Sequence, residues 1–118
     1  MIERYLLKLD RDSVVNRIRL GLMDQLPSGR VTEDDMAGLL NMSTRTLHRK
    51  LRETKETFRS ILAQVRQDLA RSYIRDRDFS ITEVAFLLGY NDTSAFSRAF
   101  RSWFGRSPTA ARDAARAA

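Results

Sequence analysis

The sequence predicts an all-α fold of seven helices, in which two similar units are joined by one long helix. Apolar residues recur at spacings of three and four, as on one face of a helix, and rarely alternate as in a strand. Helix breakers are scarce, with two prolines and five glycines among 118 residues. The pattern of residues 37–51 also returns at 85–100. The predicted segments are a lead-in or linker (1–12), a first unit (13–56), a connecting helix (57–76) and a second unit with the C-terminal helix (77–118).

The first unit contains three predicted helices. The first runs from about Ser13 to Leu26 and ends at a Pro-Ser-Gly turn. The Thr32 hydroxyl can cap the second helix, and the three acidic residues after it favour the positive end of the helix dipole. Ser43 can cap the third helix. The side chains expected to face the core from the second and third helices are Met36, Ala37, Leu39, Leu40, Leu47 and Leu51.

The connecting helix carries the longest apolar stripe of the chain and would be about 30 Å long at 1.5 Å per residue. In the second unit, Ser80 and Glu83 form a capping box, and Gly89 ends the helix that they start. Asp92 can cap the next helix. The last helix starts at Ser107, followed by a proline in the first turn, where proline is favoured.

The two units form a repeat. Three residues of the first unit match three that lie 48 positions later: Ala37, Leu40 and Met42 match Ala85, Leu88 and Tyr90. After the turn the offset becomes 49, and Leu47, Arg49 and Leu51 match Phe96, Arg98 and Phe100. A short helix, a tight turn and a basic helix, present twice, indicate two helix-turn-helix motifs. Gly89 relieves the second turn, whereas Asn41 must adopt the left-handed conformation in the first.

Positive charge is concentrated in two segments. The formal net charge is +6, and residues 45–55 and 98–118 each hold five basic side chains against one acidic side chain. This distribution favours a polyanionic partner, although charge alone cannot distinguish DNA, RNA, acidic lipid or an ordinary solvated helix face. The length of the connecting helix is close to the roughly 34–36 Å between successive major-groove faces of DNA, so one chain could read two grooves.

Other classes of function are disfavoured. The chain has no cysteine, one histidine and no catalytic or phosphate-loop motif, so we expect no enzyme activity, no metal site and no cofactor. Charged residues interrupt residues 1–12, so no signal peptide is expected, and no apolar run reaches the roughly 20 residues of a membrane span. An RNA-binding or architectural protein would need stacking aromatics or inserted wedges, and the aromatic residues at 96, 100, 103 and 104 are expected in the core.

The sequence from about residue 13 to 108 resembles the AraC/XylS family of transcription regulators. The residues that carry the resemblance most strongly are Gly89, Tyr90, Asp92, Ser94, Phe96, Ser97, Arg98, Phe100, Phe104, Gly105, Ser107 and Pro108. The connecting helix fits through Phe58, Leu62, Arg66 and Ala70. Two positions depart from the family pattern: Asn41, where glycine is common, and Ala111, where an aromatic residue is common.

The resemblance implies a bipartite, homeodomain-like domain that binds double-stranded DNA and regulates transcription. Its recognition helices, about 44–54 and 93–104, would enter two major grooves on one face of bent DNA. It also implies a bacterial protein located in the cytoplasm at the nucleoid, contact with RNA polymerase, and a separate N-terminal sensing and dimerising domain outside this chain. Related domains that accompany DNA-repair alkyl transfer need a cysteine thiolate, which this chain lacks.

The resemblance also carries over a set of contact residues. Those expected to face bases are Arg45, His48, Arg49, Thr93, Ser94, Ser97 and Arg98. Apart from the resemblance, other side chains of the two motifs are better suited to phosphate contact: Ser43, Thr46, Lys50, Arg52, Asn91 and Arg101. Arginine suits the paired acceptors of guanine, although it contacts phosphate more often. The histidine could read a base, donate to phosphate or be idle, and the short hydroxyl side chains could equally cap helices or contact the backbone. We expect Arg66 to bridge helices rather than bind DNA.

Overall fold

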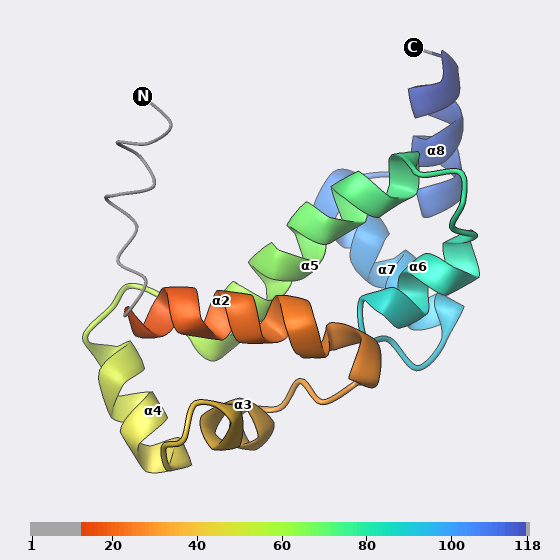
Figure 1. Ribbon diagram of the computed structural model, residues 1–118. Coiled ribbons are helices and arrows are strands. Elements are labelled where there is room, and N and C mark those ends of the chain that lie inside the picture. The colour runs from red at the N-terminus through yellow and green to blue at the C-terminus, as the bar shows by residue number, and fades with distance from the viewer. Residues whose placement is uncertain (1–12, 118) are drawn as a thin grey trace, which may run out of the picture.

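The computed structural model describes residues 13–117, and the predicted all-α fold is confirmed for them. These residues contain seven α-helices, one short 3-10 helix and no strand. The elements are α2 (Val14–Gln25), η1 (Leu26–Ser28), α3 (Glu33–Leu39), α4 (Thr44–Arg52), α5 (Phe58–Arg75), α6 (Ile81–Leu87), α7 (Thr93–Phe104) and α8 (Pro108–Ala117). The predicted lead-in at residues 1–12 lies outside the described residues. In Figure 1, α5 runs diagonally between α2, α3 and α4 on one side and α6, α7 and α8 on the other.

Local capping explains why the helices begin where they do. The side chain before each of the seven described helices accepts a hydrogen bond from the backbone amide three residues later; these caps are Ser13, Thr32, Ser43, Thr57, Ser80, Asp92 and Ser107. The capping box predicted at Ser80 and Glu83 is present, and Thr32 forms an equivalent box with Asp35. Each cap satisfies an amide that the helix itself leaves free, which contributes about 0.5–2 kcal/mol to stability.

The first hydrophobic core lies between α2, α3, α4 and the first half of α5. Its buried residues are Ile18, Leu22, Leu26, Met36, Ala37, Leu47, Leu51, Phe58, Ile61 and Val65. The prediction that Leu39 faces this core was wrong, because its side chain is 45% exposed. The inward face of the short helix α3 is set by Met36 and Ala37, and Leu39 lies more than half a turn around the helix from Ala37.

The second core lies between the other half of α5 and α6, α7 and α8. Its buried residues are Ala70, Ile74, Val84, Ala85, Leu88, Phe96 and Phe100. Trp103 and Phe104 are partly buried and pack against this core, as the sequence predicted. The apolar face of α5 therefore contributes its first half to one core and its second half to the other. The two halves of the molecule are joined through this one helix.

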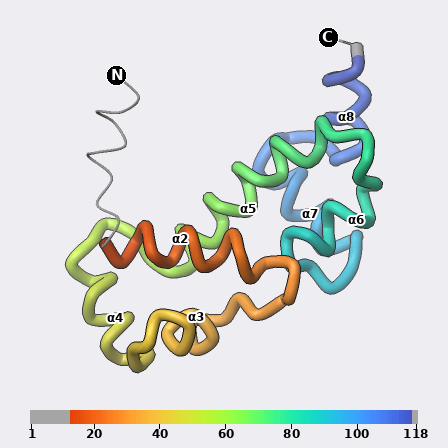
Figure 2. Tube along the Cα trace, in the orientation of Figure 1, coloured from red at the N-terminus to blue at the C-terminus, as the bar shows by residue number. Residues whose placement is uncertain are grey.

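A direct contact also joins the two halves. The turn after α6 lies against η1, and a Cβ atom added to Gly89 would lie 3.0 Å from the carbonyl oxygen of Leu26. Figure 2 shows the end of α2 and η1, in orange, next to α6 in cyan. The two halves are therefore held by α5 and by this contact between turns.

Candidate nucleic-acid interface

Helix α4 presents a basic face to solvent because its apolar residues fix the opposite face. Leu47 and Leu51 are buried four residues apart. Arg45, Arg49 and Arg52 then share the outer face, since they follow one another at spacings of four and three. All three are exposed, and they line one hollow of the surface together with Thr46 and His48. Lys50 is also exposed, on the flank of this face.

The start of α4 is tied down by its own side chains. The Ser43 hydroxyl oxygen accepts from the Thr46 amide at 3.1 Å and lies 2.9 Å from the Thr46 hydroxyl oxygen. Thr46 is half-buried and Ser43 is exposed. Of these two predicted phosphate contacts, Ser43 therefore also caps the helix, and Thr46 supplies the amide that is capped.

Helix α7, in the second half of the molecule, likewise buries an apolar face and exposes a polar one. Phe96 and Phe100 are buried, which turns Ser94, Arg98 and Arg101 to solvent. The remaining predicted contacts of this half are the half-buried Thr93 and Ser97 and the exposed Asn91. Asp92 caps the helix by accepting from the Ala95 amide at 2.7 Å. The side chains in the first turns of α7 are thus shorter than those of α4, because Ser94 and Ser97 occupy the positions of Arg45 and His48.

The turns before α4 and α7 have the same backbone conformation. Asn41 and Gly89 both have a left-handed φ, of 58° and 84°, as the repeat predicted. After each turn a backbone amide donates to the carbonyl oxygen of a buried alanine: Met42 to Ala37 at 2.9 Å and Tyr90 to Ala85 at 3.0 Å. The small alanine side chains allow the two helices of each motif to approach closely.

An arginine from the preceding long helix holds each turn. The Arg66 Nε donates to the Leu88 carbonyl at 2.8 Å, and its guanidinium lies 4.3 Å from the centre of the Tyr90 ring. The predicted bridging role of Arg66 is therefore confirmed. Burial lowers the pKa of Arg66 and raises the pKa of Tyr90, and the attraction between the two groups partly offsets each shift. In the first half, Arg17 donates to the Leu40 carbonyl at 3.2 Å.

Sequence reasoning missed three groups of polar contacts. Arg17 was one, although it lies 49 positions before Arg66, the same offset as in the second part of the repeat. Another is Arg112 of α8, which donates to the Ile74 carbonyl at 2.8 Å and to the Asp76 carbonyl at 3.1 Å and so fixes the end of α5.

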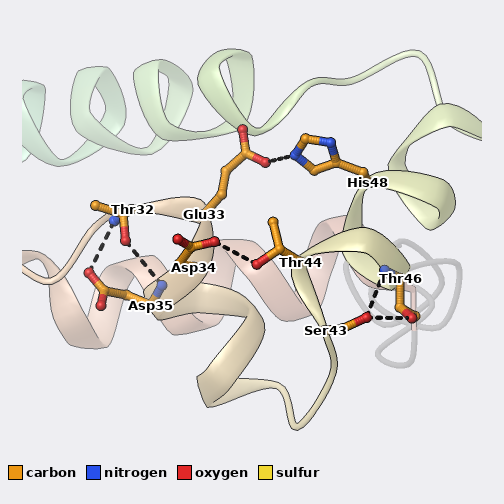
Figure 3. A network of polar contacts seen from close by, with 8 residues as sticks. All are labelled: Thr32, Glu33, Asp34, Asp35, Ser43, Thr44, Thr46 and His48. Atoms are coloured by element: carbon orange, nitrogen blue, oxygen red, sulfur yellow. Dashed lines mark hydrogen bonds and ion pairs between the residues drawn. The ribbon is translucent and has the colours of Figure 1, made fainter.

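The third missed group joins the start of α3 to α4. The Thr44 hydroxyl donates to the Asp34 carboxylate at 2.6 Å, and the His48 Nε2 contacts the Glu33 carboxylate. Figure 3 shows both contacts leading from adjacent acidic residues to successive turns of α4. His48 therefore does not simply project away from the protein, as a free base-reading side chain would.

The described residues contain no group of three or more metal-ligating side chains placed to share an ion. Within residues 13–117, every helix is too short or too polar to cross a bilayer.

Comparison with known proteins decides the family. A family model described as a helix-turn-helix domain matches residues 36–114, which include both turns and both exposed helices. The chain belongs to the AraC/XylS helix-turn-helix family. DNA binding and the regulation of transcription are the activity of this class, and its members are not enzymes.

Individual relatives agree with this membership. The transcriptional activator NphR of a Rhodococcus species is 36% identical over 100 residues, which are 85% of this chain and 30% of NphR. A crystal structure of a DNA-binding transcriptional dual regulator from Escherichia coli K-12 superposes with a TM-score of 0.82 at 27% identity, over 90% of this chain and 95% of that chain. The C-terminal domain of AraT, a response regulator from Geobacillus stearothermophilus, gives 0.75 at 26% identity, over 89% and 88% of the two chains. The chain spans about a quarter to a little over a third of the length of the curated relatives that it matches.

Proposed function

We propose that this AraC/XylS-type chain regulates transcription by reading two successive major grooves on one face of double-stranded DNA, with α4 in one groove and α7 in the next. The observation that carries the proposal is the presentation of two exposed helices by similar modules on one 18-residue helix. At 1.5 Å per residue, α5 is about 27 Å long, which is compatible with groove faces roughly 34–36 Å apart once the width of the modules is added. In this proposal residues 13–56 and 77–118 are the reading modules, and 57–76 is the spacer.

The proposal divides the exposed side chains by role. The residues proposed to face bases are Arg45, His48, Arg49, Thr93, Ser94, Ser97 and Arg98. The residues proposed to contact phosphates are Ser43, Thr46, Lys50, Arg52, Asn91 and Arg101. The central position of Arg49 on the outer face of α4 supports its assignment to a base, because a guanidinium there can meet the paired acceptors of guanine. The position of Lys50 on the flank supports contact with the sugar-phosphate backbone.

We also propose that the chain acts as the DNA-binding part of a longer regulator. In that protein an N-terminal sensing and dimerising domain would precede this chain, and the DNA-bound regulator would contact RNA polymerase in the bacterial cytoplasm, at the nucleoid. The lengths of the relatives support this, since the chain spans 30% of NphR, and its structural counterpart in AraT is a C-terminal domain.

Selection of binding sites from a random pool of duplex DNA tests the groove reading. The expected result is a two-part motif whose halves lie about 10–10.5 base pairs apart. Arg49→Ala should then weaken binding to the selected site by about 1–3 kcal/mol and relax one base position. Lys50→Ala, its neighbour with the same charge, should weaken all sequences alike and reduce the salt slope by about one. A one-part motif, or equal losses on selected and random DNA for Arg49→Ala, would contradict the proposal.

A further inference from the structure

We infer that Glu33, on the first turn of α3, determines the DNA specificity of the first module by holding His48 in place. The inference rests on the proposed function of α4, and it assigns a role to a residue that does not itself lie on α4. Glu33 acts as a positioning residue: its carboxylate contacts Nε2 of the imidazole and so restricts the orientations in which His48 meets DNA.

Helix capping does not account for the Glu33 carboxylate. Three acidic residues open α3, and the third, Asp35, completes the capping box with Thr32. Glu33 and Asp34 instead reach across to α4, where they contact His48 and Thr44. These two partners are four residues apart and so lie one above the other on the same face of α4 (Figure 3). Adjacent carboxylates therefore hold two successive turns of the proposed reading helix.

The second module has the same helix arrangement but lacks these two carboxylates. The capping residue is acidic in both modules, since Glu83 occupies the position of Asp35. The other two carboxylates are replaced by Ile81 and Thr82. Thr82 keeps only a 3.5 Å contact with Thr93, the residue equivalent to Thr44, and isoleucine cannot bind the residue equivalent to His48, which is Ser97. Of the two modules, only the first thus has carboxylates that contact the proposed reading helix from the preceding helix.

The side chains of His48 and Glu33 are 50% and 37% exposed. An exposed contact of this kind contributes little to folding stability, and the helix dipole favours an acidic residue here whichever partner it has, so neither explains the choice of His48 as partner. A carboxylate beside a DNA-binding helix also repels phosphate, which lowers affinity for all DNA. A residue that disfavours DNA in general but orders a proposed base contact increases the ratio of specific to non-specific binding.

The test measures affinity for two duplexes of equal length, one with the selected site and one of random sequence. Glu33→Ala should weaken binding to the selected site by up to about fivefold, which corresponds to the roughly 1 kcal/mol at the upper end for an exposed pair. Binding to random DNA should not weaken. In a His48→Ala background, Glu33→Ala should leave the ratio of the two affinities unchanged, because its partner is gone.

Two further variants separate orientation from charge. Glu33→Gln removes the charge but keeps an oxygen that can accept from the imidazole, so it should retain most of the specificity that Glu33→Ala loses. Glu53→Ala removes the same charge from the exposed C-cap of α4 and should change both affinities equally. His48 is the only histidine in the chain, so its imidazole NMR signals are resolved without assignment; they should shift in Glu33→Ala and not in Glu53→Ala.

The outcomes distinguish the inference from the proposed function. If the wild-type chain binds both duplexes equally, the proposed function itself fails. If the wild-type chain prefers the selected site, two results would overturn the inference alone. In the first, Glu33→Ala keeps the wild-type preference. In the second, Glu33→Ala reduces the preference by the same factor in the His48→Ala background as in the wild type.

Discussion

Replacement of Gly89 by alanine should destabilise the chain more than the same replacement at Gly105. Both glycines have a left-handed backbone, with φ of 84° and 78°. An alanine in this conformation costs roughly 1–2 kcal/mol at either site. Only at Gly89 would the new Cβ meet other atoms: the Leu26 carbonyl oxygen at 3.0 Å and the Arg66 guanidinium at 3.3 Å. Nothing lies within 4 Å of a Cβ at Gly105.

The difference between the two variants isolates the contact between the modules. The Leu26 oxygen belongs to the backbone, so the turn after α6 or η1 must move to accommodate the methyl group. Overpacking of this kind costs about 1–3 kcal/mol in addition to the backbone strain. Urea unfolding followed by circular dichroism gives the free energies, and each 1 kcal/mol corresponds to a melting temperature roughly 4 °C lower for a chain of this size.

A second readout comes from DNA. Because the displaced turn separates the two modules, Gly89→Ala should bind two-part sites with altered spacing almost as well as the original site, whereas Gly105→Ala should keep the wild-type preference. Equal losses of stability at Gly89 and Gly105 would refute the role of the contact with Leu26. Full stability in both variants would refute the argument from left-handed backbone as well.

Three other substitutions test the turns and the spacer. Asn41→Gly should raise the free energy of unfolding by up to about 1 kcal/mol, since glycine is less strained at a φ of 58°; a loss of stability would contradict this. Gln64→Pro, at an exposed site inside α5, should cost about 3 kcal/mol or more and uncouple the two half-sites, whereas Gln64→Ala should preserve two-part binding; a proline variant that still recognises both halves would exclude α5 as the spacer. Arg66→Lys keeps the charge but removes the planar guanidinium that donates to the Leu88 carbonyl, so it should lower the melting temperature of the chain in thermal denaturation. An unchanged melting temperature would show that charge alone holds the turn.

The parts of the fold that the sequence predicted depend on local interactions. Thr32 and Ser80 cap their helices through amides three residues away, so the pattern is visible without knowledge of the tertiary structure. The same holds for the left-handed turn at Asn41, which the repeat identified by comparison with Gly89. The predicted exposure of Arg49 also followed from a local cause, since Leu47 and Leu51 determine which face of α4 is buried.

The features that sequence reasoning missed depend on distances across the fold. Helix α3 has only seven residues, and its apolar pattern did not reveal that Leu39 lies outside the core. The acceptor of Arg17 is a backbone carbonyl 23 residues away, and no sequence pattern marks a carbonyl as available. The contact of Glu33 with His48 spans 15 residues and required the angle between α3 and α4, which the turn at Asn41 fixes.

The spacing of the two proposed reading helices depends on more than the length of α5. A single helix fixes the distance between two modules but leaves each free to tilt about its own attachment point. Here the turn before α7 packs on η1 of the first module through Gly89 and Leu26, while Arg66 of α5 holds the same turn at the Leu88 carbonyl. Three elements thus meet at one turn, which restrains rotation as well as distance. In the proposed complex, a DNA site with the wrong spacing would have to break this contact or bend to meet both helices, so we expect the turn at Gly89 to contribute to specificity through the spacing of the two helices.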